Sequence, residues 1–268
     1  MSSSQHGDTA SELRVVFLAS GSRGNTLAVC SADDVILVDV GLSARETRRR
    51  LADAAIDESH VRAILLTHEH SDHVAGVRVL ARQLDVPVLA TGGTIREASA
   101  HLASIETVEC IRPDNDVRIG GLRIRAFRTS HDAAEPVGYA FEDARGVRFG
   151  LASDTGHVPA PALEVLESCT IVGLETNHDV NMLRTGSYPY FLKERILSRT
   201  GHLSNDDAAS VFERLIESGV RSMCALHLSE QNNTPDIVRR ALESCTERLG
   251  ACIDVKVASQ HATVVCSA

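Results

Sequence analysis

Three histidines and one aspartate occur within residues 68–73. They directly follow the apolar run 63–66, whose composition predicts a buried strand. Imidazole and carboxylate groups are ligands for zinc, manganese and iron. His68 and His70 are two residues apart, so on extended backbone their side chains point the same way and can share an ion. A solvated, histidine-rich loop is the alternative, but ligand spacing directly behind a buried strand argues against it.

The other two potential ligands of this segment come after the chain has turned. Residues 74–84 have a helical pattern, so Asp72 and His73 lie where the strand gives way to a helix. They can therefore face a second ion. Two adjacent ions are the arrangement of a two-metal hydrolytic site.

Two metal ions need more protein ligands than these four side chains. Isolated histidines and aspartates that directly follow predicted strands are the candidates, because strand ends gather at one edge of a layered α/β protein. Any one of them alone would more often cap a helix or lie on the surface. Three in the same setting, beside a ready-made cluster, indicate a single site. They are His131, Asp154 and His227.

His202 precedes a predicted helix, a position where spacing does not assign it to a metal. An imidazole there can donate a proton or bind an anion beside the helix N-terminus. His178 follows another predicted strand and is a weaker candidate, whose role stays open. The remaining histidines have no such setting and are expected on the surface. They are His6, His60, His101, His157 and His261.

Several serine and asparagine side chains close to these histidines have two open roles. They could hold phosphate oxygens, or they could form turns and helix caps, which is the commoner use of these residues. The residues concerned are Ser130, Asn177, Ser204, Asn205 and Asn232. The sequence does not choose between the two roles.

The 268 residues carry a formal net charge of −9. This charge argues against binding nucleic acid through a global basic field. A local basic groove is still compatible with it, and bound divalent cations would change the sign of the site. Arg23, Arg184, Lys193 and Arg195 could contribute to such a groove or could simply be solvated.

The seven cysteines are scattered, and none forms a Cys-x-x-Cys pair. This favours reduced thiols in a cytoplasmic protein. Residues 1–12 are largely polar and lack the apolar region of a signal peptide, so we expect a disordered N-terminal segment. No apolar run approaches the length needed to span a bilayer, so no membrane partner is expected.

The elements that must position these residues run from strands to helices in each half of the chain. No linker separates the halves, so we expect residues 13–268 to form a single α/β domain, a four-layer αββα sandwich. A doubly wound sheet is the alternative. Residues 74–84 and 94–103 are predicted helices. Ser43 and Glu46 predict a capping box at the start of another helix.

At this point the motifs resemble those of a known superfamily. Residues 68–73 have the His-x-His-x-Asp-His pattern of the metallo-β-lactamase fold superfamily, and the turn at Asp39 is similar to the one that precedes this pattern. The isolated ligands after later strands fall in the order of the superfamily's later metal motifs. The resemblance covers nearly the whole chain and implies the four-layer sandwich.

Further motifs resemble one branch of that superfamily, the bacterial YycJ/WalJ family, which is related to ribonuclease Z and associated with exonuclease activity on DNA. The segments that carry this resemblance are 19–25, 130–133, 177–179, 201–205, 227–229 and 232–233. The resemblance implies a cytoplasmic metal-dependent phosphodiesterase, with nucleic acid as substrate and DNA favoured over RNA. Neither an inserted arm for tRNA nor an added β-CASP-type domain is found.

The same resemblance implies a role for each ligand. Two divalent ions would be bound, zinc or manganese, with iron also acceptable to these donors. One ion would be held by His68, His70 and His131, the other by Asp72, His73 and His227, and Asp154 would bridge both.

The predicted catalytic residues are Asp72 and His202. The two ions would share a water, and the bridging hydroxide would attack phosphorus in line. By resemblance to ribonuclease Z-like enzymes, His202 would protonate the leaving oxygen or steady the phosphate. Asp39 would orient a ligand histidine.

Other chemistries stay open at this stage. A thioester or other ester hydrolase of the glyoxalase II type is the main alternative, although the Gly201-His202 motif favours phosphate esters. Redox chemistry of the flavodiiron type is disfavoured, because those relatives usually carry Glu where His70 stands. A protein that only binds is disfavoured by the complete ligand set. The oligomeric state is open, with a homodimer as one candidate.

Overall fold

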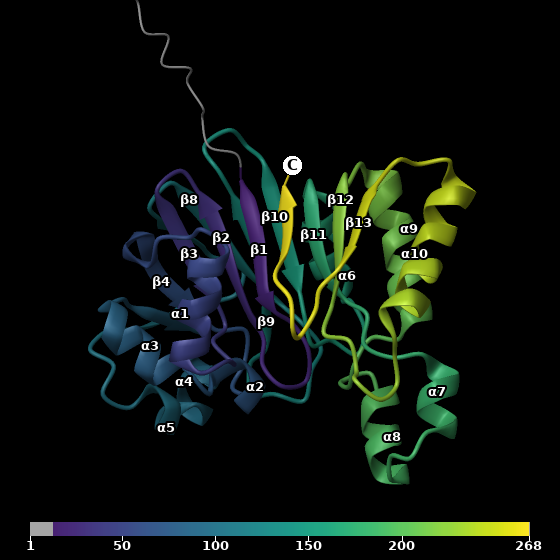
Figure 1. The fold of residues 1–268 in the computed structure, drawn as a ribbon, viewed down its shortest axis with the longest axis horizontal. Helices are drawn as coiled ribbons and strands as arrows, with labels where there is room; N and C mark the ends of the chain where they lie inside the picture. The colour runs from purple at the N-terminus through teal and green to yellow at the C-terminus, as the bar shows by residue number, and fades with distance from the viewer. Residues whose placement is uncertain (1–12, 268) are drawn as a thin grey trace, which may run out of the picture.

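The computed structural model describes residues 13–267. The disorder expected for residues 1–12 lies outside this range. Two seven-stranded sheets pack face to face and helices cover their outer faces (Figure 1). The predicted four-layer αββα sandwich is therefore confirmed, and the doubly wound alternative is wrong.

The first sheet has the strand order β14-β1-β2-β3-β4-β5-β6. Its first strands pair antiparallel, and from β3 onward the pairing is parallel. The strands are β1 (Arg14–Ala19), β2 (Thr26–Ser31), β3 (Asp34–Val38), β4 (Val61–Leu65), β5 (Val88–Ala90), β6 (Val108–Cys110) and β14 (Val264–Ser267). The helical elements in this half are α1 (Ala44–Asp53), η1 (Glu58–His60), α2 (Ser71–Val74), α3 (Val77–Leu84), α4 (Gly92–Glu97) and α5 (Ser99–Leu102).

The second sheet has the order β13-β12-β11-β10-β9-β8-β7. β7 to β10 form an antiparallel run, and β10 to β13 are parallel. The strands are β7 (Asp116–Ile119), β8 (Leu122–Arg128), β9 (Val137–Glu142), β10 (Arg148–Ala152), β11 (Ile171–Glu175), β12 (Ser222–Leu226) and β13 (Asp254–Val257). The helices are α6 (Ala160–Glu167), α7 (Val180–Thr185), α8 (Tyr190–Leu197), α9 (Asn205–Ser218) and α10 (Pro235–Leu249).

The core between the sheets contains several of the chain's few aromatic residues. Phe17 from the first sheet meets Phe149 from the second edge to face, with ring centroids 6.3 Å apart. Phe141 stacks on Phe149 with centroids 5.9 Å apart. Each aromatic ring buries a large apolar area, so these contacts hold the sheets together. Two further apolar clusters fill the spaces between each sheet and its helices.

The helical segment that follows β4 and the histidine-rich motif differs from the prediction. The predicted helix 74–84 is two helices, and the first of them begins at Ser71. The break lies at Gly76, whose N–H donates to the carbonyl of Val40 at 2.8 Å. A Cβ on Gly76 would lie 2.0 Å from the carbonyl oxygen of Leu42. The close approach of the loop after β3 therefore divides the helix.

Other local predictions were also incomplete. The predicted helix 94–103 is α4 followed by α5, and the short elements β6 and α7 were missed. Ser43 caps α1 as predicted, with its side chain accepting from the N–H of Glu46. The reciprocal half of the capping box is absent among the described contacts, because the Glu46 carboxylate binds Arg49 and Arg50 instead. Within residues 13–267, no helix has the length and apolarity required for a membrane span.

The contact at Gly76 gives a test of this packing. Gly76→Ala is expected to lower the free energy of unfolding by about 1–3 kcal/mol, because the added methyl overlaps the backbone of Leu42. Denaturant unfolding measures the change. Gly121→Ala is the matched control, since its Cβ would meet only one carboxylate oxygen, at 3.7 Å. Equal stability of the two variants would contradict the packing argument.

Candidate metal centre

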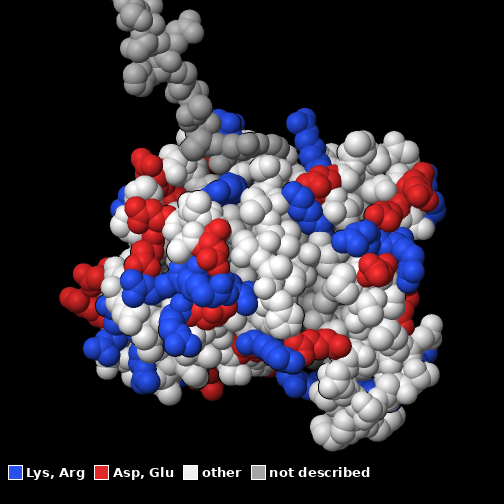
Figure 2. Space-filling model, viewed as in Figure 1, with Lys and Arg blue, Asp and Glu red and all other residues white. Residues whose placement is uncertain are grey.

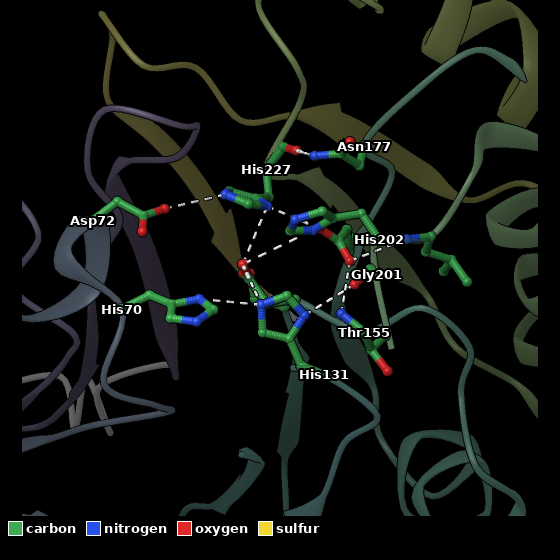
Figure 3. A network of polar contacts seen from close by, with 12 residues as sticks. His70, Asp72, His131, Thr155, Asn177, Gly201, His202 and His227 are labelled. Carbon is green, nitrogen blue, oxygen red and sulfur yellow. Dashed lines mark hydrogen bonds and ion pairs between the residues drawn. The ribbon is translucent and has the colours of Figure 1, made fainter. Parts of the chain in front are cut away.

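The predicted ligands lie at one edge of the sandwich, where strands of both sheets end. β4 leads into His68 and His70, while β8, β10 and β12 of the second sheet lead into His131, Asp154 and His227. Figure 3 shows side chains from these loops converging on one space. The structure brings all seven predicted metal ligands together, in two adjacent groups.

The first group consists of His68, His70 and His131, whose candidate ligand atoms lie within 4.8 Å of one another. Nε2 of His131 is 3.3 Å from Nδ1 of His70. At that separation the two rings can share either a proton or a cation. These are the three histidines predicted to hold one ion.

The second group consists of Asp72, His73, Asp154 and His227, again within 4.8 Å. Asp154 lies between the two groups, with Oδ1 3.4 Å from Nε2 of His73 and Oδ2 3.9 Å from Nε2 of His131. Oδ2 of Asp72 is 3.5 Å from Nε2 of His227. Asp154 is thus the carboxylate positioned to contact two ions at once.

Two buried histidines of the site have a fixed partner at Nδ1, the ring nitrogen opposite the one that faces the ligand groups. Nδ1 of His73 lies 2.8 Å from Oδ2 of Asp39, which also accepts from the hydroxyl of Thr67. Nδ1 of His131 donates to the carbonyl of Gly201 at 2.9 Å. An acceptor at Nδ1 places the proton there and leaves Nε2 free to coordinate. Asp39 therefore occupies the orienting position expected from the sequence.

Glu175 is the functional residue that sequence reasoning missed. It is the last residue of β11 and is fully buried. Its Oε1 accepts from Nδ1 of both His227, at 2.8 Å, and His202, at 2.7 Å, and its Oε2 accepts from the N–H of Thr155. The signal was available, since a carboxylate ends an apolar strand just as the other ligands follow theirs. His178, three residues later, was the weaker candidate named in this segment.

His202 lies beside the two groups, partly exposed, with its Nδ1 held by Glu175 and its ring 5.2 Å from that of His227. Its backbone N–H donates to the carbonyl of Ile196 in α8. Burial disfavours the charged ring, but the Glu175 carboxylate outweighs this and raises the pKa of His202. The contact with Glu175 therefore favours the protonated form of His202 next to the predicted metal ligands.

Three residues of the site have left-handed backbone conformations. Asp39, Asp154 and His227 have φ values of 57°, 47° and 53°. This region is unfavourable for residues with a Cβ and costs about 1 kcal/mol or more at each position. The surrounding contacts hold this strain, and it aims each side chain out of the strand end and into the site.

The electrostatics of the site favour a positive charge at its centre. Burial opposes ionisation of Asp154, but His227 and His73 lower its pKa well below the usual value. The pKa of Asp72 is likewise lowered despite burial, because the imidazoles of His227 and His73 each approach its carboxylate to 3.5 Å. Burial and the neighbouring His73 lower the pKa of His68, which keeps that ring neutral. Burial disfavours the charged form of His73 and His227, but the carboxylates around them outweigh it and raise the pKa of both rings. Metal coordination requires ionised carboxylates and neutral imidazoles, so these two rings would release a proton when a metal ion binds.

Two ring nitrogens test whether the residues fit a metal. Nε2 of His68 and Nε2 of His227 are buried and have no hydrogen-bond partner among residues 13–267. Leaving such a group unsatisfied costs about 1–3 kcal/mol each. Both atoms face the space shared by the two groups, and a donor set of nitrogen and carboxylate oxygen suits zinc, manganese or iron. The residues present therefore fit divalent metal ions.

Most of the serines and asparagines near the site make structural contacts, which leaves little for phosphate. Ser204 caps α9, and the Asn177 side chain donates to the carbonyl of His227. Asn205 pairs with a neighbouring asparagine, and the Ser130 hydroxyl donates to a carbonyl. His178 is buried and belongs to none of the ligand groups. Neither of its ring nitrogens has a partner within the described residues.

Comparison with known proteins agrees with this geometry. Residues 35–228 match the family model of the beta-lactamase superfamily domain. The chain is 39% identical over 235 residues to exodeoxyribonuclease YycJ of Bacillus anthracis, an alignment that covers 87% of this chain and 89% of that protein. It is 36% identical over 247 residues to exodeoxyribonuclease WalJ of Streptococcus pneumoniae, covering 90% and 91%.

A solved structure gives the same fold. The metallo-β-lactamase fold protein YhfI of Bacillus subtilis superposes with a TM-score of 0.73 at 15% identity, covering 96% of this chain and all of that one. The chain belongs to the metallo-β-lactamase superfamily. Within it, the chain belongs to the YycJ/WalJ family.

The contact between Asp39 and His73 gives a test of the centre. Asp39→Asn keeps the shape but removes the acceptor for the Nδ1 proton of His73, so metal affinity is expected to fall about 10- to 100-fold. Metal retention against a graded series of chelators measures this. Asp34→Asn is the control, since Asp34 binds Arg62 away from the cluster. Unchanged retention in Asp39→Asn would contradict the orienting role.

Proposed function

We propose that the protein is a dinuclear-metal-dependent phosphodiesterase that acts as a DNA exonuclease. The observation that carries the proposal is the pair of ligand groups joined at Asp154, with the Glu175–His202 pair beside them. The names of the family relatives, both exodeoxyribonucleases, support DNA as the polymer.

In this proposal each ligand group holds one divalent ion, zinc or manganese. His68, His70 and His131 hold the first, and a second set, joined to the first by Asp154, holds the other. That second set is Asp72, His73 and His227. When bound, two such ions supply a water of lowered pKa and neutralise charge on the scissile phosphate. Asp72, on the more exposed side of its group, also faces the attacking water.

His202 is the proposed proton donor. Its Nδ1 is held by Glu175, so the partly exposed ring keeps Nε2 for the substrate. Glu175 raises the pKa of His202 and so favours the protonated ring, which donation to a leaving alkoxide requires. Glu175 does not touch the substrate in this scheme. It positions His202 and His227 together, one for proton transfer and one for metal binding.

The proposal predicts a metal-dependent nuclease activity. Purified protein with Mn²⁺ or Zn²⁺ should release nucleotides from the ends of labelled DNA, cleave a model phosphodiester and lose both activities with a chelator. His202→Ala should lower kcat about 10²- to 10⁴-fold, the usual contribution of a general acid, with metal content unchanged. RNA and a glutathione thioester are tested in parallel. Thioester turnover without phosphodiester cleavage would instead establish the glyoxalase II-type alternative.

The pH dependence gives a separate test of the Glu175–His202 pair. Since Glu175 raises the pKa of His202, donor activity is present below that pKa and is lost as pH rises through it. Glu175→Gln removes the charge, so the alkaline limb of the kcat profile should move to lower pH. Profiles on the model phosphodiester measure the shift. An alkaline limb at the same pH in both proteins would assign it to another group.

A further inference from the structure

Two aromatic side chains project into solvent from α8, the helix whose C-terminal end contacts the loop of His202. Tyr190 is 76% exposed and Phe191 is 74% exposed, at the start of α8. The chain has no tryptophan and only nine aromatic residues in all, three tyrosines and six phenylalanines. Exposed adjacent rings are costly for a folded protein and mark binding surfaces.

The two rings belong to a protruding part of the molecule, the α7–α8 lobe, defined as residues 180–199. In Figure 1 α7 and α8 extend below the two sheets, on the side of the molecule where the loops of the candidate site lie. Figure 2 shows that the face of this lobe in view is largely free of charged side chains. The lobe therefore combines a projecting position with an uncharged face.

The end of α8 is joined directly to the candidate metal centre. The backbone N–H of His202 donates to the carbonyl of Ile196 at 3.0 Å. A Cβ on Gly201 would lie 2.2 Å from the carbonyl oxygen of Arg195, so this loop packs against the helix without space for a side chain. Gly201 in turn accepts from His131. The lobe cannot shift without moving His202 and a metal ligand.

One face of α8 points toward the site. The Arg195 guanidinium binds Asp132 at 2.5 Å, and the other carboxylate oxygen of Asp132 is 3.3 Å from Nε2 of His131. Phe191 is four residues before Arg195, so the two side chains share a helix face, about 6 Å apart along the axis. Phe191 thus lies one helical turn from a residue that contacts the metal-ligand loop.

The charge of the lobe is opposite to that of the whole chain. Residues 180–199 contain four basic residues and one acidic residue, a net charge of +3, whereas the full chain carries −9. Arg184 and Arg199 are exposed, and their side chains have no ion-pair partner within residues 13–267. Cationic side chains beside exposed aromatic rings are the combination that binds single-stranded nucleic acid.

We propose that Tyr190 and Phe191 form a stacking platform for unpaired bases, so that the enzyme binds its substrate as a single-stranded end threaded into the metal centre. The inference rests on the proposed nuclease function and names the form of its substrate. The bases stack on the rings, Arg184 and Arg199 contact the backbone, and the terminal phosphodiester reaches the site beside His202. A second copy of the chain is the competing occupant of the same face.

The test compares Phe191→Ala, Phe191→Leu and Phe191→Trp, with Leu249→Ala as a control at an exposed apolar side chain of α10. Binding of a single-stranded oligonucleotide that carries 2-aminopurine near its end is followed by fluorescence, which requires no turnover. Phe191→Ala and Phe191→Leu should weaken binding and raise KM for the oligonucleotide about 10-fold, since each lacks the ring. Phe191→Trp should retain both, and the control should match the wild type.

Hydrolysis of a small phosphodiester separates this inference from the proposed function. All four variants should retain wild-type kcat on it, because they leave the metal ligands and His202 intact. Arg184→Ala and Arg199→Ala should each flatten the dependence of log K on log salt by about 0.7. Unchanged oligonucleotide binding in Phe191→Ala overturns the platform. If Phe191→Ala dissociates a dimer but leaves KM for the oligonucleotide unchanged, the platform is also overturned, and this face of α8 instead binds a second copy of the chain. If the wild type cleaves no phosphodiester but the fluorescence response depends on the ring, the proposed function fails and the platform stands.

Discussion

Asp154 is a buried carboxylate enclosed by imidazole rings, and the rest of the site is arranged to compensate its negative charge. Removing an ion from water is expensive unless opposite charge and hydrogen bonds replace the hydration. Here His73 and His227 approach it from the first metal motif and from the end of β12. Asp39, Asp72 and Glu175 add further negative charge around it, which bound divalent cations would oppose. Those cations are what the unpartnered Nε2 atoms of His68 and His227 indicate.

Glu175 contacts two histidines, His202 and His227, that lie on different loops and have different proposed roles. The same carboxylate oxygen accepts from His202 and from His227, so the proposed proton donor and a proposed metal ligand are positioned by one rigid strand end. Burial opposes its ionisation, yet His202 and His227 lower the pKa of Glu175 to about 2. An ionised, immobile acceptor of this kind fixes both rings before substrate arrives, which is the preorganisation that catalysis by placed charges requires.

The surface around the site resolves an apparent conflict between an acidic chain and a polyanionic substrate. A net charge of −9 disfavours binding along the whole surface, but the α7–α8 lobe is locally positive and carries the exposed rings. The bound cations would add further positive charge at the point of cleavage. Attraction confined to one lobe and one centre suits an enzyme that works from an end of the polymer.

Much of this protein follows from short-range sequence pattern. The segment from His68 to His73 has its candidate ligands at local spacing, and apolar runs identify the strand ends before His131, Asp154 and His227. The sandwich and the clustering of these side chains were therefore predictable. Elements with a weak local sequence pattern, or with a cause distant in the sequence, were not predicted. β6 has only three residues, with a polar one at its centre, and the break at Gly76 arises from a loop distant in sequence.

Only the tertiary structure decided which side chains contact one another at the site. Glu175 ends an apolar strand as many carboxylates do, and nothing local reveals that two histidines from other loops meet it. The same holds for Phe191, whose ring is a platform only because α8 ends against Gly201 and His202. Spacing along the chain sets which groups are available. Their partners are set by packing two sheets face to face, which brings together residues that lie far apart in the sequence.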